Sequence, residues 1–107
     1  MEQITPRVLK AWLDDADRPK PLLLDVRETR EYEICHIDGS QLIPMSTIPA
    51  RAGELERDRD IVVICHHGGR SFQVAMFLEQ QGFTHLHNLN GGVEAWAQQV
   101  DSTMARY

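Results

Sequence analysis

The sequence lacks several features that would place the protein outside the cytoplasm or in a membrane. It has only two cysteines and no apolar signal-peptide core, so we predict a cytoplasmic protein in a reducing compartment. No apolar run approaches the length of a membrane span, which argues against a membrane partner. Repeats and low-complexity segments are absent, and the length suits one hydrophobic core but not two. We therefore predict a single domain over residues 1–107.

The chain also has no excess of positive charge. The formal net charge is −5, which argues against nucleic acid or an anionic membrane as the main partner. Hydrophobic residues make up 42% of the chain and charged residues 25%, as is ordinary for a soluble globular domain. Composition therefore leaves a compact enzyme or binding domain as the expected class.

Strand-like and helix-like segments alternate along the chain. The expected strands cover residues 3–4, 22–26, 41–43, 61–65 and 85–89. Helices are expected to begin after Thr5 and Asn90, and to cover residues 28–35, 48–55 and 71–81. Trp12 lies on an apolar helical stripe, where we expect it to pack in the core. This alternation predicts an α/β domain with a five-stranded, mostly parallel sheet covered by helices on both faces.

The central segment combines a buried strand, a tight loop and a helix. Four β-branched apolar residues, Ile61 to Ile64, precede Cys65 and predict a strand buried on both faces. The loop that follows contains His66, His67, Gly68, Gly69 and Arg70, and Ser71 is expected to open the helix. Ligands of parallel sheets bind outside the carboxyl ends of the strands, so this loop is the candidate site.

Cys65 has two interpretations. A cysteine that ends a core strand is usually a buried, inert residue. A helix N-terminus, loop amides and the Arg70 cation would instead stabilise a thiolate, which is the nucleophilic form of cysteine. Because a merely buried cysteine does not need the Gly-Gly-Arg-Ser continuation, we favour a reactive Cys65 that the loop presents to solvent.

Four motifs of the chain resemble those of one known protein family. Cys65-His66-His67-Gly68-Gly69-Arg70-Ser71 is similar to the Cys-x-x-Gly-x-Arg-Ser active-site loop of rhodanese-like sulfurtransferases. Three further stretches resemble the family in the same order, and together the four cover nearly the whole chain. They are Leu24-Asp25-Val26-Arg27-Glu28, His36-Ile37-Asp38-Gly39-Ser40 and Leu89-Asn90-Gly91-Gly92-Val93-Glu94-Ala95-Trp96.

The resemblance implies a rhodanese-like fold and the transfer of a sulfane sulfur through a persulfide on Cys65. The donor would be thiosulfate or a persulfide, and the acceptor a thiol, cyanide or a partner protein. His66, His67, Gly68, Gly69, Arg70 and Ser71 would bind the substrate. Thiosulfate-preferring members often carry basic side chains after the cysteine, whereas His66 and His67 are only partly charged near neutral pH.

No cofactor or metal is expected for this chemistry. The histidines at positions 66, 67, 85 and 87 share no zinc-binding spacing with one another or with the cysteines.

Two other functions remain as alternatives. Cysteine phosphatases and arsenate reductases hold an oxyanion with a Cys-x5-Arg loop, but only four residues separate Cys65 from Arg70. A shorter loop favours one sulfur atom over a tetrahedral oxyanion. Some rhodanese-like modules only dock partners, and these usually lack the cysteine that this chain has.

Three side chains, those of Asp25, Cys35 and Arg70, also have two interpretations each. Asp25 could be a base, but we favour a structural carboxylate near Arg27, since a carboxylate beside a thiol opposes thiolate formation. Cys35 could resolve a persulfide, but we expect a packed, inert side chain. Arg70 could either recognise the anionic part of a donor or form a salt bridge with a nearby carboxylate.

Overall fold

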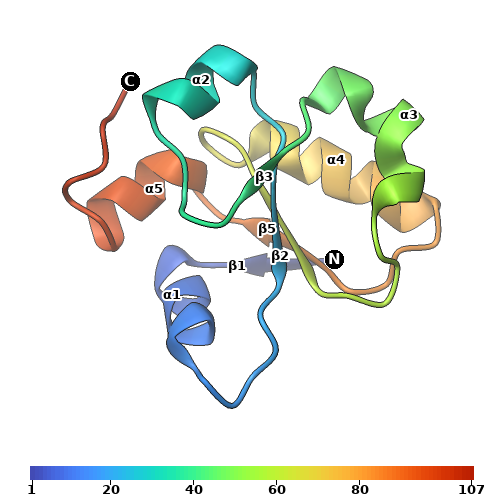
Figure 1. Cartoon of the computed structure of the whole chain (residues 1–107), viewed down its shortest axis with the longest axis horizontal. Helices are drawn as coiled ribbons and strands as arrows, with labels where there is room; N and C mark the ends of the chain where they lie inside the picture. Colours follow the sequence, from blue (N-terminus) through green and yellow to red (C-terminus); the bar gives the residue numbers. More distant parts are fainter.

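The fold was obtained as a computed structural model that describes all residues, 1–107. Strands and helices alternate along the chain (Figure 1). The strands are β1 (Glu2–Ile4), β2 (Leu22–Asp25), β3 (Gln41–Leu42), β4 (Ile61–Ile64) and β5 (Leu86–Leu89). The helices are α1 (Pro6–Asp14), α2 (Thr29–Ile34), α3 (Ile48–Arg51), α4 (Gly69–Gln80) and α5 (Gly92–Gln99), with short 3-10 turns on either side of α3.

The five strands form one sheet in the order β1-β5-β4-β2-β3. Every pairing is parallel, which confirms the predicted α/β class and makes the sheet fully rather than mostly parallel. The apolar strand β4 lies at the centre, between β2 and β5. Its carboxyl end, and hence Cys65, is therefore enclosed by neighbouring strands on both sides.

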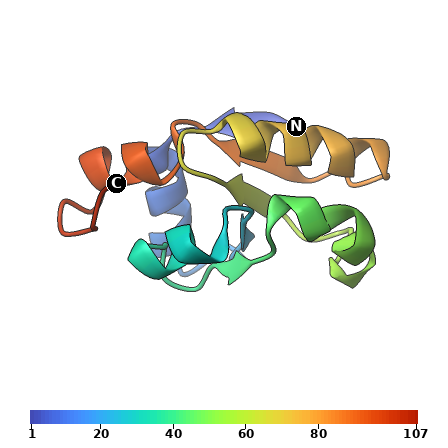
Figure 2. The same ribbon diagram turned by 90° about the horizontal axis from the view of Figure 1, so that it is seen from above.

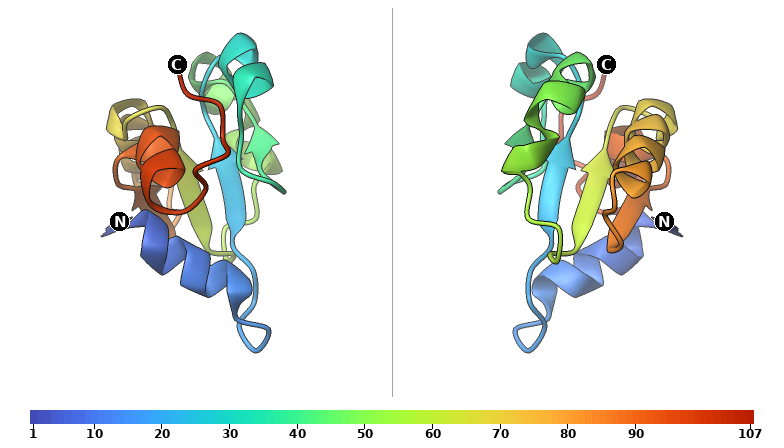
Figure 3. Two further views of the ribbon diagram at one scale, coloured as in Figure 1. Left: turned by 90° about the vertical axis from the view of Figure 1, so that its left-hand side faces the viewer. Right: turned by 90° about the vertical axis from the view of Figure 1, so that its right-hand side faces the viewer.

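Helices cover both faces of the sheet, as predicted. Helices α1 and α5 lie in front of the sheet in the left panel of Figure 3, and α3 and α4 lie in front of it in the right panel. Residues 61–65, which are β4 and the residue after it, alternate between the two cores. Val62 and Ile64 pack in the α1–α5 core, and Ile61, Val63 and Cys65 pack in the α3–α4 core. Trp12 is 3% exposed in the α1–α5 core, as expected.

Several helix boundaries differ from the predictions. Helix α3 ends at Arg51 rather than at residue 55, and α2 covers Thr29–Ile34 rather than residues 28–35. Helix α4 begins at Gly69, two residues before Ser71. Its N-cap is Gly68, which adopts the left-handed conformation. Helix α5 is preceded by Gly91 rather than capped by Asn90. The amide of Asn90 instead donates to the carbonyl of Ile4 (2.8 Å), which continues the β1–β5 pairing by one residue.

The helices are short. The longest, α4, has 12 residues, and no helix combines the length and the apolar character needed to span a bilayer.

Candidate active site

The predicted loop lies at the carboxyl edge of the sheet. It connects β4 to α4, and Figure 2 looks onto this edge, where α2, the loop and the end of the chain lie near one another. The structure thus gathers Cys65 and residues 66–71 at one place, as the motif indicated. Segments distant in sequence supply the remaining side chains of the site.

The Cys65 sulfur has two direct polar neighbours. The amide of Gly68 donates to Cys65 Sγ at 3.1 Å, and Ser71 Oγ lies 3.3 Å from the same sulfur. The Ser71 hydroxyl donates to Asn88 Oδ1, while the Asn88 amide group donates to Gln3 Oε1 at 2.9 Å. Since a hydroxyl has one proton, Ser71 accepts from the Cys65 thiol in this arrangement and donates to the sulfur only after turning away from Asn88.

The prediction that the loop presents Cys65 to solvent is wrong for this structure. Cys65 is 1% exposed, and none of the three surface cavities is lined by Cys65 or by residues 66–71. The reason is that Cys65 continues the alternation of β4 and points into the α3–α4 core. Access to the sulfur therefore requires a movement of the side chains that surround the loop.

The first turn of α4 leaves amides free beside this sulfur. The N–H groups of Gly69, Arg70 and Ser71 have no hydrogen-bond acceptor within the protein, whereas the amide of Phe72 already bonds the Gly68 carbonyl. Unpaired amides at a helix N-terminus, together with the helix dipole, favour a bound anion. A persulfide anion on Cys65 would extend from the sulfur that the Gly68 amide already contacts.

Two glycines permit the close packing around the loop. Gly68 has φ of +105°, and a Cβ there would lie 3.2 Å from the Gly91 nitrogen. Gly92 has φ of +60°, and a Cβ there would lie 2.4 Å from the carbonyl oxygens of both Cys65 and His66. Helix α5 can therefore start directly against the backbone of the loop only because residue 92 has no side chain.

Helix α5 also bonds the loop. The amide of Val93 donates to the Cys65 carbonyl at 2.9 Å, and the amide of Glu94 donates to the His66 carbonyl at 3.1 Å. These two bonds use free N–H groups of the first turn of α5, so the loop serves as the cap of this helix.

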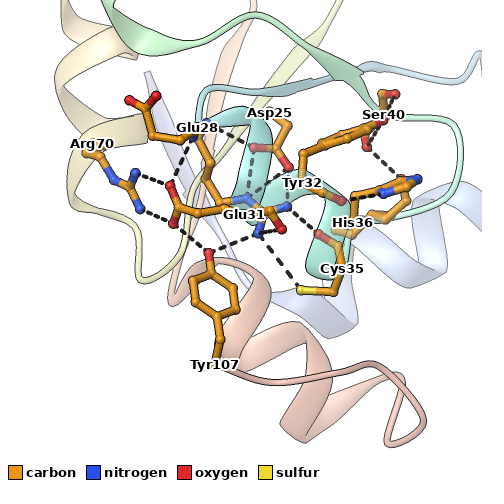
Figure 4. A network of polar contacts seen from close by, with 11 residues as sticks. Asp25, Glu28, Glu31, Tyr32, Cys35, His36, Ser40, Arg70 and Tyr107 are labelled. Atoms are coloured by element: carbon orange, nitrogen blue, oxygen red, sulfur yellow. Dashed lines mark hydrogen bonds and ion pairs between the residues drawn. The ribbon is translucent and has the colours of Figure 1, made fainter.

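Of the two interpretations of Arg70, donor recognition and a salt bridge, the structure shows the salt bridge. Its guanidinium donates to Glu31 Oε1 at 2.7 Å and to Glu31 Oε2 at 2.9 Å (Figure 4). These hydrogen bonds hold the pKa of the Glu31 carboxyl well below its usual range, although burial opposes the shift. They also raise the pKa of Arg70, and the nearby Cys65 adds to this effect.

Tyr107 joins the same cluster from the end of the chain. Its hydroxyl donates to Glu31 Oε2 at 2.7 Å and accepts from Arg27 Nη1 at 2.9 Å (Figure 4). Burial raises the pKa of Tyr107 to about 12, so the hydroxyl remains a donor near neutral pH. The Tyr107 ring stacks on His66, with ring centroids 3.9 Å apart and an angle of 12° between the planes.

Asp25 has the structural role that we favoured. It is fully buried and forms an ion pair with Arg27, whose Nη2 donates to Asp25 Oδ2 at 2.7 Å. Arg27 also donates to the carbonyl oxygen of Cys35 at 2.7 Å. Asp25 thus anchors an arginine that holds α2 and its following turn against the sheet.

The two loop histidines differ in their surroundings. His66 is half-buried, its ring lies 3.9 Å from that of His67, and its Nε2 lies 3.8 Å from Glu94 Oε2 without a hydrogen-bond partner. Burial and the neighbouring His67 lower the pKa of His66, which favours the uncharged ring. His67 lies at the surface.

Cys35 is packed, as expected. It is 9% exposed in the α1–α5 core, and its sulfur lies 3.9 Å from Arg27 Nη1. No three His, Cys, Asp or Glu side chains meet in an arrangement that could hold a metal ion.

Three side chains of the site were not predicted from the sequence: Glu31, Asn88 and Tyr107. Asn88 is a buried polar residue of strand β5, beside His87 and Leu89, and such a position can indicate a hydrogen bond to a buried group. Glu31 belongs to a Glu-x-x-Glu capping pattern at the start of α2, which explains its orientation but not its contact with Arg70. Tyr107 has no local signal.

Comparison with known proteins finds related sequences and structures. A profile of the rhodanese-like domain family matches residues 5–99. The probable adenylyltransferase/sulfurtransferase MoeZ of Mycobacterium tuberculosis is 42% identical over 106 residues, which are 97% of this chain and 26% of that protein. The chain thus spans about a quarter of the length of that relative.

Two further relatives are similar over most of their own length. A sulfurtransferase of Allochromatium vinosum is 42% identical over 82 residues, 77% of each chain. The crystal structure of a rhodanese-like domain protein from Staphylococcus aureus superposes with a TM-score of 0.83 at 32% identity, over 90% of this chain and 91% of that one.

Proposed function

Because the chain belongs to the family of rhodanese-like domains, we propose that it is a sulfurtransferase that carries a sulfane sulfur as a persulfide on Cys65. The observation that carries this proposal is the pair of features at the Cys65 sulfur. The Gly68 amide donates to it, and the adjacent amides of Gly69, Arg70 and Ser71 are free. A thiol bonded to one amide, followed along the chain by three unpaired N–H groups, suits one additional sulfur atom held as an anion.

The first step is attack by the Cys65 thiolate on the outer sulfur of a donor. With thiosulfate, the new bond joins Cys65 Sγ to the outer sulfur, the donor's S–S bond breaks, and sulfite leaves with the electron pair. With a persulfide RS–SH, the same attack releases the thiolate RS⁻ and leaves Cys65 as S–SH. In the second step, a thiol, cyanide or protein acceptor attacks the outer sulfur and the Cys65 thiolate returns.

Ser71 supports the thiolate in this scheme. In the resting arrangement its proton bonds Asn88 Oδ1, and its oxygen faces the Cys65 sulfur at 3.3 Å. When the thiol loses its proton, rotation of the Ser71 hydroxyl supplies a second donor to Sγ, beside the Gly68 amide. A thiolate with two or three donors is stabilised relative to one in an apolar core.

The test is intact mass spectrometry after exposure to thiosulfate or to an organic persulfide. The parent should gain one sulfur atom, which cyanide or dithiothreitol should remove. Cys65→Ser should gain none, while Cys35→Ser should behave like the parent because Cys35 lies in the α1–α5 core.

Loss of sulfur uptake in Cys35→Ser alone would contradict the assignment of Cys65. A parent that takes up no sulfur from either donor would instead be a partner-binding module. Steady hydrolysis of aryl phosphates by the parent would favour the phosphatase class, which the four-residue gap between Cys65 and Arg70 argues against.

A further inference from the structure

The only cation of the Cys65 loop is already paired. Both terminal nitrogens of Arg70 bond the two carboxylate oxygens of Glu31, at 2.7 and 2.9 Å (Figure 4). Such a bidentate pair places one negative charge directly against the guanidinium. The remaining N–H groups of Arg70 can still donate hydrogen bonds, but they carry little net charge toward a substrate.

Glu31 is also held in place from other directions. It receives the Tyr107 hydroxyl at 2.7 Å, and its Oε1 accepts the Glu28 amide at 3.0 Å in a capping box at the start of α2. The low pKa of Glu31 keeps this carboxylate charged throughout the physiological range. Neither protonation nor a free rotation of the side chain therefore releases Arg70.

The other charges around the loop are paired as well. Arg27 is bonded to Asp25, and the Arg106 guanidinium to Glu94. His66 is favoured in its uncharged form, and His67 lies at the surface. The surroundings of Cys65 therefore present neutral N–H donors, and each of the three arginines among them is paired with a carboxylate.

The pairing of these charges affects thiosulfate and organic persulfides differently. Thiosulfate carries two negative charges, and its sulfite group would approach Arg70 against the like charge of Glu31. A persulfide with an uncharged organic group carries at most one negative charge, on its outer sulfur, and has no second charged group that must approach Glu31. Its outer sulfur needs only the free amides of α4. If the chain transfers sulfur as proposed above, we infer that Glu31 is a specificity-determining residue that directs the loop toward organic persulfides and against thiosulfate.

The experiment compares kcat/KM for thiosulfate and for 2-hydroxyethyl persulfide in parent, Glu31→Gln and Glu33→Gln proteins. Glutamine can keep the capping box at position 31 while it removes the charge. The ratio of thiosulfate to persulfide kcat/KM should rise by about tenfold in Glu31→Gln, because Arg70 is freed for the donor. Glu33→Gln removes the same charge from an exposed position of α2 and should leave the ratio unchanged.

A second variant separates the loss of charge from a loss of packing around Glu31. Tyr107→Phe removes a hydroxyl that donates to Glu31 but leaves the carboxylate charged and paired with Arg70, so the ratio should stay near that of the parent. An unchanged or lower ratio in Glu31→Gln, or an equal rise in Tyr107→Phe, would overturn the inference. Either outcome differs from failure of the proposed function, in which the parent itself acquires no sulfur from either donor.

Discussion

The Ser71 hydroxyl illustrates how a single proton is shared at this site. Ser71 Oγ lies between Cys65 Sγ and Asn88 Oδ1, and it has one proton for two acceptors once the thiol ionises. Asn88 cannot turn easily, because its own amide group bonds Gln3 Oε1 and the Gly68 carbonyl. The acceptor that receives the Ser71 proton therefore depends on whether Cys65 is a thiol or a thiolate.

Removing this hydroxyl should slow the first sulfur-transfer step. In Ser71→Ala the thiolate loses one donor, which is worth about 1.4 kcal/mol, so release of sulfite from thiosulfate in a single turnover should slow by about tenfold. The rate should recover partly at alkaline pH, where the thiolate forms without assistance. The measurement is rapid-mixing kinetics across pH, with the melting temperature as the check on folding. An equal slowing at every pH would show that Ser71 only maintains the packing around Asn88.

At the scale of elements, the Cys65 loop lies between two helices that use it differently. Helix α4 begins at the end of the loop and directs free amides toward it, whereas α5 donates its own first amides to the carbonyls of Cys65 and His66. The loop is therefore fixed from its carbonyl side, while the N–H groups of the first turn of α4 remain unpaired. This division requires Gly92, the residue at which α5 touches the loop.

A methyl group at position 92 should separate α5 from the loop. Gly92→Ala places a Cβ 2.4 Å from two carbonyl oxygens and imposes a positive φ on alanine, so we expect a loss of at least about 2 kcal/mol. For a domain of this size the melting temperature should fall by roughly 10 °C, with slower sulfur transfer in the folded fraction. Gly53→Ala is the matched control, because a Cβ there meets no atom within 4 Å. Equal melting temperatures for the two variants would mean that α5 does not depend on this contact.

At the scale of the whole molecule, Glu31 connects helix α2 to two distant parts of the chain. Arg70 is 39 residues away and Tyr107 is 76 residues away, yet both bond the same carboxylate. Its pKa in the folded state lies below the unfolded value, so its contribution to stability is complete above about pH 5 and is lost as the pH falls.

Acid should therefore weaken the parent more than a variant without this carboxylate. Below about pH 4.3 the parent should lose about 1 kcal/mol per pH unit relative to Glu31→Gln, as the unfolded chain takes up the proton. Urea unfolding at about pH 7 and about pH 3 measures this difference, and Glu33→Gln serves as the control on the same helix. A constant stability gap between parent and Glu31→Gln at both pH values would exclude the expected linkage.

The fold and the Cys65 loop can be predicted from the sequence, but the long-range contacts of the site and the burial of Cys65 cannot. β-Branched runs such as Ile61–Ile64 identify buried strands locally, and the Cys65–Ser71 motif is continuous, so both can be read directly. The Arg70–Glu31 and Tyr107–His66 contacts join segments whose relative positions depend on the packed sheet. The burial of Cys65 likewise depends on the α3–α4 core into which its side chain points, and helix propensity carries no information on that packing.

The strand order has a consequence for synthesis of the protein. Strand β1 leaves the ribosome first, but its only partner in the sheet is β5, the last strand to be made. Residues 2–4 must therefore wait, unpaired, until residue 89 has emerged, and by then most of the central sheet can already have assembled. Pairings of such long sequence separation close slowly. We expect the amino-terminal strand to dock after translation of the domain, and an exposed edge on β5 to persist until it does.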